Sequence, residues 1–194
     1  MTLGRPQKFD TDTVLEAAMN VFWAKGYEAS SLQDLLKATH LSKSSLYKTF
    51  LNKEKLFEQC LLRYQDNLAK NMRVTLSEAR SGVSFIEQAL LENAKEAKGN
   101  SKKIGCFLLN TAVEFSQEKP SIAAIVSKSI ARFESIFEEA VTLAKRNKEI
   151  SGVAGTKELA QFIFNSFVGL KNRVKAGASQ KEVESIVKMT IRAL

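Results

Sequence analysis

Apolar residues recur at intervals of three and four along nearly the whole chain, and no segment shows the alternation of a half-buried strand. In the stretch LSKSSLYKTFLNKEKLF, Leu46 and Phe50 lie one helical turn apart. The sequence therefore predicts an all-α fold of about nine helices. Their expected ranges are about 10–26, 31–39, 42–50, 53–79, 83–98, 105–117, 121–147, 156–174 and 179–194.

Two of these helices are short and separated by only a few residues. Ser30 or Ser31 can cap the first of them, and Ser42 can cap the second after the turn sequence THLS. Two such helices form a helix-turn-helix, whose second helix can enter the major groove of DNA. We expect a helix-turn-helix domain at residues 1–63, built from three helices, and a larger helical domain at residues 64–194.

The second helix of this unit has a polar face beside its apolar stripe. The polar residues are Lys43, Ser44, Ser45, Tyr47 and Lys48. Side chains of these types bind base edges and phosphates, and Lys53 opens the next helix, where backbone amides could help it to hold a flanking phosphate. Residues 35–53 include four lysines and no acid, although residues 1–60 as a whole carry eight basic and seven acidic side chains. The alternative is a lysine face that only meets solvent.

Composition and charge narrow the class of protein. The chain has 44% hydrophobic and 26% charged residues, which indicates a globular protein, and its net charge of +8 favours an anionic partner without identifying it. The longest uncharged stretch has twelve residues, at 159–170, whereas a membrane helix needs roughly 20. The amino terminus lacks the apolar core of a secretory signal. We therefore expect a cytoplasmic protein with reduced cysteines and no membrane partner.

The sequence offers little for catalysis. It has one histidine, no HExxH motif, no glycine-rich phosphate loop and two cysteines without metal-ligand spacing. We expect neither an enzyme nor a metal or other cofactor. A helical interaction module that uses its helix-turn-helix only for packing remains an alternative, and a membrane-surface protein is disfavoured because glutamates interrupt the lysine-rich helices.

The amino-terminal third resembles the TetR/AcrR transcriptional regulators over roughly 60 residues. The resemblance rests on GRPQKFD followed by VLEAAMNVFWAKGYEASSLQDLLKATHLSKSSLYKTFLNKEKLFEQCL. It implies a homodimeric repressor that binds double-stranded DNA at a palindromic operator and carries a ligand-binding carboxyl-terminal body. The predicted DNA-contact residues are Ser30, Ser31, Lys43, Ser44, Ser45, Tyr47, Lys48 and Lys53.

Three positions depart from the family pattern. His40 stands where the family has glycine in the turn, and we expect it to adopt the left-handed conformation that histidine tolerates. Ser44 also replaces a frequent glycine, which changes what the helix can read. Thr49 replaces an aromatic residue or histidine and puts one phosphate contact in doubt.

The penultimate helix carries apolar stripes on two sides, and the last helix carries one apolar stripe. Phe162, Phe167 and Leu170 share one stripe of the penultimate helix, and Val183 and Val187 belong to the last. A dimer interface formed by these helices and their symmetry mates is one interpretation, and an intramolecular core is the other.

Cys106 is the candidate sensor of a small-molecule effector. It lies near a helix start, where the dipole together with Lys102 and Lys103 could lower a thiol pKa. The chain resembles a TetR/AcrR subgroup with Gly-Cys at this position, which implies an effector that is an electrophile or oxidant. A small buried core residue is the alternative. Lys171 or Lys175 could supply a cationic neighbour, and the residues that could line an apolar pocket, or simply form core, are Phe107, Asn110, Phe133, Phe137 and Asn165.

Overall fold

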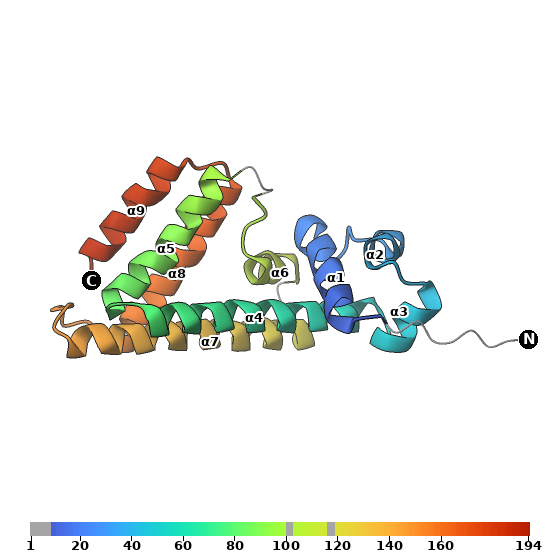
Figure 1. Ribbon diagram of the computed structural model, residues 1–194, viewed down its shortest axis with the longest axis horizontal. Helices are drawn as coiled ribbons and strands as arrows, with labels where there is room; N and C mark the ends of the chain where they lie inside the picture. The colour runs from blue at the N-terminus through green and yellow to red at the C-terminus, as the bar shows by residue number, and fades with distance from the viewer. Residues whose placement is uncertain (1–8, 100–102, 116–118) are drawn as a thin grey trace, which may run out of the picture. The chain divides into compact units, whose positions relative to one another are not determined.

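In a computed structural model of the chain, the described residues, 9–99, 103–115 and 119–194, form nine α-helices and no strand. The predicted all-α fold is confirmed. The helices are α1 (Thr11–Lys25), α2 (Leu32–Thr39), α3 (Lys43–Phe50), α4 (Lys53–Glu78), α5 (Gly82–Lys98), α6 (Phe107–Phe115), α7 (Pro120–Arg146), α8 (Thr156–Lys175) and α9 (Gln180–Arg192) (Figure 1). The end of the helix expected at 105–117 lies outside the described residues.

The chain divides into two compact units, of which the first ends at Tyr64 and the second begins at Gln65. The first unit contains α1, α2, α3 and the start of α4, and the second contains the rest of α4 and α5 to α9. The assignment of DNA binding to residues 1–63 and of ligand binding to residues 64–194 stays a prediction, because compactness alone does not assign function.

Side-chain caps fix the short helices of the first unit. Ser31 and Asp34 form a reciprocal capping box at the start of α2, and the Ser42 hydroxyl accepts a hydrogen bond from the Ser45 amide at the start of α3. His40 ends α2 with φ 56° and ψ 24°, which confirms the expected left-handed turn residue. Local chemistry therefore sets both ends of the turn between α2 and α3.

An aromatic cluster forms the centre of the first unit. The Phe57 ring of α4 meets the Phe22 ring of α1 edge-on, with centroids 4.9 Å apart, and the Tyr27 ring at 5.0 Å. Leu46 and Phe50 bury the apolar side of α3. This anchorage leaves the opposite side of α3 for solvent or a partner.

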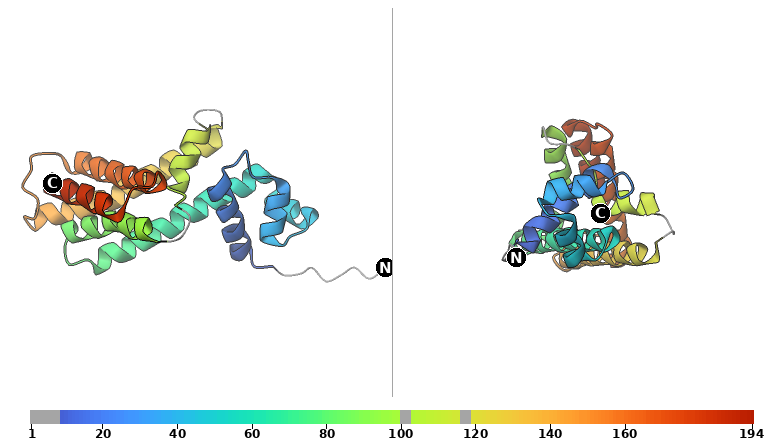
Figure 2. Two further views of the ribbon diagram at one scale, coloured as in Figure 1. Left: turned by 90° about the horizontal axis from the view of Figure 1, so that it is seen from above. Right: turned by 90° about the vertical axis from the view of Figure 1, so that its right-hand side faces the viewer.

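Long helices joined by distant contacts build the second unit. Arg73 of α4 binds the Glu139 carboxylate of α7 through two hydrogen bonds of 2.9 and 3.0 Å. Helices α5, α8 and α9 pack together over α4 and α7 (Figures 1 and 2). Gly82 lets α5 begin against α7, because a Cβ atom there would lie 2.2 Å from the Ala140 carbonyl oxygen. No helix within the described residues combines the length and apolar character needed to span a bilayer.

Candidate nucleic-acid interface and effector site

Helix α3 separates its apolar and polar residues cleanly. Leu46 and Phe50 are buried, whereas Lys43, Ser44 and Lys48 are exposed. Tyr47 and Ser45 are half-buried at the edge of the polar face. The structure thus brings five of the predicted contact residues onto one short helix, with three of them open to solvent.

The serines at the start of α3 bind one another. The Ser42 hydroxyl lies 3.0 Å from the Ser44 hydroxyl and 2.9 Å from the Ser45 hydroxyl. Thr49, one turn later, donates its hydroxyl to the Ser45 carbonyl at 2.9 Å. These contacts fix the hydroxyl oxygens at the amino-terminal end of α3, the end of a recognition helix that reaches base edges.

The two serines before α2 differ in accessibility. Ser31 is exposed, although its hydroxyl is bound to the Asp34 carboxylate at 2.7 Å. Ser30 is fully buried and donates its hydroxyl to the Gly26 carbonyl at 2.5 Å. Ser30 therefore braces the turn between α1 and α2, and it does not belong to a surface that could touch DNA.

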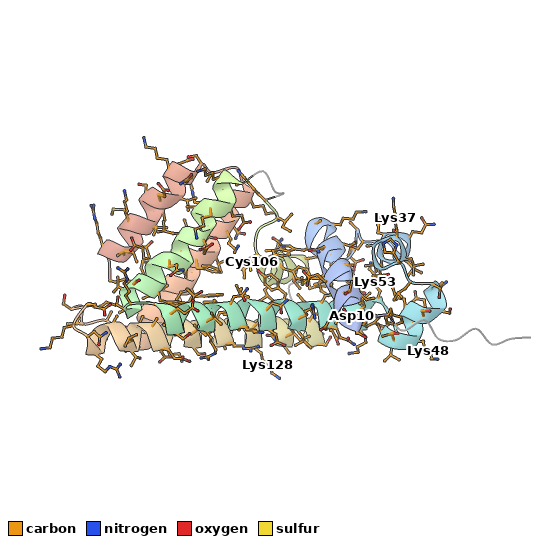
Figure 3. The ribbon with its side chains drawn as sticks, viewed as in Figure 1. Asp10, Lys37, Lys48, Lys53, Cys106 and Lys128 are labelled. Atoms are coloured by element: carbon orange, nitrogen blue, oxygen red, sulfur yellow. The ribbon has the colours of Figure 1, made fainter. Side chains whose placement is uncertain are left out.

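Lysines lie in and near the polar face of α3. Lys48 and Lys37, near the end of α2, are exposed (Figure 3), and so is Lys43. None of the three forms an ion pair with a carboxylate among the described residues. Lys53 is half-buried, with its ammonium 4.3 Å from the centroid of the Tyr27 ring. The surface that these lysines and the polar face of α3 form is called the cationic face below.

The connection between α3 and α4 is strained. Leu51 has φ 66° and ψ −57°, and the Asn52 amide donates to the Phe50 carbonyl at 2.7 Å, which makes a γ-turn centred on Leu51. The Leu51 side chain is 73% exposed, so burial does not compensate for the strain. No sequence signal marked this leucine as a residue with positive φ.

A cavity of about 270 Å³ lies inside the second unit between α4, α5 and α8. Its lining is Leu68, Asn71, Met72, Thr75, Phe85, Gln88, Ala89, Glu92, Phe167 and Lys171. Of the residues predicted to line a pocket or to supply a cation, only Lys171 lines this cavity. A larger hollow of about 510 Å³ is an open groove lined by residues of α7 alone. It would enclose a ligand less completely than the cavity does.

Several predicted pocket residues lie elsewhere in the second unit. Phe107, Phe133 and Phe137 are buried in the core, where the Phe137 ring lies 5.8 Å from Phe85 and 6.1 Å from Phe167. Asn165 is exposed on α8 and does not face the interior. Aromatic spacing along a helix predicted burial correctly but could not separate a core from a cavity wall.

Known protein families match both units of the chain. Residues 14–60, which include α2 and α3, match the family model described as bacterial regulatory proteins of the tetR family. Residues 88–190 match the model of the tetracyclin repressor-like carboxyl-terminal domain, which covers more than half of the chain. The chain belongs to the TetR family of transcriptional regulators.

Two curated relatives and one solved structure extend the match over nearly the whole TetR-family chain. The HTH-type transcriptional repressor ComR of Escherichia coli is 32% identical over 97% of this chain and 90% of its own length. The HTH-type transcriptional regulator YezE of Bacillus subtilis is 26% identical over 99% of this chain and 100% of its own. A cysteine mutant of the TetR-family regulator CifR, complexed with 26-base-pair operator DNA, superposes with a TM-score of 0.86 at 28% identity, over 97% of this chain and 99% of that one.

Cys106 lies immediately before α6 in this TetR-family chain and is buried, with 3% of its surface exposed. The preceding Gly105 has φ 75°, and a Cβ atom there would lie 2.9 Å from the Lys175 side chain. Asn110 connects the neighbouring groups, since its amide donates to the Ile104 carbonyl at 2.8 Å and its oxygen accepts from the Lys175 ammonium at 3.0 Å. Lys175 therefore packs beside the residue that precedes Cys106.

The other cations considered for Cys106 are placed differently. Lys171 binds the Glu96 carboxylate at 2.8 Å and faces the cavity. Lys102 lies outside the described residues. In the first unit, burial in the core raises the pKa of the Cys60 thiol.

Proposed function

We propose that the chain is a homodimeric repressor that binds a palindromic operator through its cationic face and releases it on binding a small effector or on modification of Cys106. The observation that supports this most is the exposed polar side of α3, anchored by Leu46 and Phe50 on its other side. The role is regulatory and not catalytic. As the family model describes bacterial proteins, whose DNA is cytoplasmic, we propose the cytoplasm as its location.

The proposed contacts divide into two kinds. Lys43, Ser44 and Ser45 begin α3 and would reach base edges, with Tyr47 beside them. Lys48, Lys53 and Ser31 would bind phosphates at the groove edges, where charge sets affinity more than sequence. CifR, a 28% identical protein, is complexed with operator DNA, which supports DNA as the partner.

A dimer would place two such helices in successive major grooves, about 34 to 36 Å apart. Helix α8 offers an exposed face for the contact: Phe162 is 42% exposed, Asn165 follows three residues later, and Gly169 leaves open space where a Cβ would stand. Met189 of α9 is 61% exposed. We propose that Asn165 belongs to this dimer face.

The decisive experiment selects bound duplexes from a random pool and then measures affinity for the selected operator by fluorescence anisotropy. Lys43→Ala and Tyr47→Ala should each weaken specific binding by about tenfold, because each removes a contact at the base edges. Lys128→Ala, at an exposed lysine of α7, is the matched control for lost charge (Figure 3). Full operator affinity in the Lys43/Tyr47 double variant would remove the assignment, and size measurement by light scattering shows whether the dimer persists.

The effector has two proposed receiving sites. The cavity between α4, α5 and α8 suits a small and mostly apolar molecule, since Leu68, Met72 and Phe167 supply apolar walls. Cys106 suits an electrophile, although its burial requires an opening before reagent can reach the sulfur. Both sites lie in the second unit, but the cavity would bind an apolar molecule and Cys106 would react with an electrophile.

Treatment with a mild electrophile distinguishes the two sites. Cys106→Ser should retain operator binding and show a dose-response at least tenfold weaker than that of the unmodified chain, because the nucleophile is missing. Peptide mass spectrometry should find the adduct at Cys106 and not at Cys60, whose raised pKa keeps it protonated. An unchanged dose-response in Cys106→Ser would assign Cys106 to the core.

A further inference from the structure

Lys53 occupies a position that helix stability alone does not favour. It is the first residue of α4, where the positive end of the helix dipole repels a cation. Asn52 already caps this end by accepting a hydrogen bond from the Lys55 amide at 2.8 Å. The lysine therefore needs another source of stabilisation, and the structure supplies one.

The Tyr27 ring lies against the Lys53 ammonium. The nitrogen is 4.3 Å from the ring centroid, within the range of a cation–π contact. Tyr27 stands in the turn after α1, far from Lys53 in sequence, and only 8% of its surface is exposed. The contact joins the start of α4 to the aromatic cluster of the first unit.

Neighbouring lysines of the same unit have a different kind of partner. Lys25 binds the Asp34 carboxylate at 2.6 Å, and Lys55 binds Glu58 at 2.7 Å. A carboxylate cancels the charge of its lysine, so a phosphate would have to displace it. An aromatic ring attracts the ammonium without cancelling its charge, and Lys53 forms no ion pair with any carboxylate among the described residues.

The ring is itself held in place. It stacks on Phe22 with centroids 6.1 Å apart and meets Phe57 at 5.0 Å. A lysine side chain loses rotamer freedom when it binds a phosphate, and a fixed ring that already restrains the ammonium reduces this loss.

We propose that Tyr27 is a positioning residue for DNA binding: its ring holds the Lys53 ammonium, still charged, where an operator phosphate is received. This rests on the proposed function, since it presumes that the cationic face meets DNA. Tyr27 does not touch DNA itself, because its ring is buried behind Lys53.

The test is a double-variant cycle measured with the selected operator. Tyr27→Leu removes the ring, Tyr27→Phe keeps it, and each is made in the unmodified chain and in Lys53→Ala. Tyr27→Leu should weaken binding about fivefold when Lys53 is present and have no effect in Lys53→Ala, whereas Tyr27→Phe should bind like the unmodified chain. Lys53→Ala should lower the salt dependence by about one phosphate contact per protomer, and Tyr27→Leu should leave it unchanged because the charge remains.

The outcomes separate positioning from simple packing. An equal loss from Tyr27→Leu with and without Lys53 would mean that Tyr27 only supports the fold, and no loss in either would also overturn the proposal. If Tyr27→Leu does not fold, as judged by the fluorescence of the single tryptophan, Trp23, fluorinated phenylalanines at position 27 replace it. They weaken the negative face of the ring while its shape is kept, so affinity should fall stepwise with fluorination, and a flat series would contradict the contact.

A readout without DNA keeps the two proposals distinguishable. In the free protein, the ring should shift the proton resonances of the Lys53 side chain upfield, and Tyr27→Leu should abolish this shift. A chain that shows the shift and binds no duplex would overturn the proposed function and the role of Tyr27 in it, while the contact itself would stand.

Discussion

Lys37, Lys43 and Lys48 of the first unit project into solvent without an ion pair to any described carboxylate, whereas some cations of the second unit connect helices. In the second unit Arg73 binds Glu139, and Lys171 binds Glu96. The first unit can also pair its cations where helices meet, because Arg63 of α4 binds Asp12 and Glu16 of α1. Lys37, Lys43 and Lys48 thus stand apart within the first unit, as exposed cations that no described carboxylate neutralises.

This difference separates the charges that hold helices together from the charges that we propose meet a partner. Like charges on one face repel each other, so they do not stabilise the folded chain. A polyanion changes the sign of that interaction, because each lysine that meets a phosphate releases counterions. Paired cations of the second unit instead fix how α4, α5, α7 and α8 align.

The largest of the expected stability effects tests this division directly. Glu96→Ala should lower the free energy of unfolding by about 1.5 kcal/mol, because it leaves the Lys171 ammonium, with 17% of its side chain exposed, without its acceptor. Lys48→Ala should change the same free energy by less than about 0.5 kcal/mol, because that lysine is exposed and forms no ion pair with a described carboxylate. Urea unfolding followed by circular dichroism measures both.

Two results would contradict this contrast between paired and unpaired cations. Equal losses in the two variants would show that Lys48 is tied into the fold after all. An unchanged free energy of unfolding in Glu96→Ala would show that water replaces the Lys171–Glu96 ion pair between α5 and α8 without cost.

A smaller effect of opposite sign is expected in the first unit. Leu51→Gly should raise the free energy of unfolding by about 1 kcal/mol, because glycine adopts φ 66° without strain and an exposed leucine loses little burial. Leu51→Ala is the control, since it keeps the Cβ atom that causes the strain. The fluorescence of Trp23, whose ring meets Tyr64 at 5.0 Å, reports unfolding of this unit. A gain in Leu51→Ala as large as that in Leu51→Gly would place the cause in the side chain.

Sequence predicted the first unit better than the second for a physical reason. The caps at Ser31 and Ser42, the turn at His40 and the exposed face of α3 depend on residues within one or two helical turns of each other. The cavity collects residues from α4, α5 and α8, such as Leu68, Phe85 and Phe167, which are brought together only by packing. Periodicity shows that such residues are buried but not which of them border empty space.

Ser30, which was predicted to contact DNA, and Tyr27, for which no role was predicted, illustrate the same limit. Ser30 has the side chain of a cap and of a phosphate contact, and only the turn after α1 shows that its hydroxyl faces the Gly26 carbonyl. Tyr27 belongs to the segment that carried the family resemblance, yet its contact with Lys53 spans the turn and two helices. Sequence spacing cannot supply either contact.

The smallest expected effect is a loss of stability at low pH, and it tests whether a charged side chain stabilises the first unit. Asp34 accepts hydrogen bonds from the Lys25 ammonium and from Ser31, which lower the pKa of its carboxyl from 3.8 to about 2. Because the folded pKa lies below the unfolded one, the carboxylate stabilises the fold fully above pH 4 and loses this contribution as the pH falls from about 4 to 2. The carboxyl is partly exposed, so salt screens the effect.

Asp34→Asn measures this contribution, because the amide cannot ionise. The unmodified chain should be the more stable of the two near neutral pH, and the difference between them should shrink on acidification through that window, as read from Trp23 fluorescence in urea. Carbon NMR titration of Asp34 gives the pKa independently. A midpoint near 3.8 would show that Lys25 and Ser31 do not hold the carboxylate in solution; Lys25 would then join the unpaired lysines, and the separation of paired from unpaired charge in the first unit would have to be redrawn.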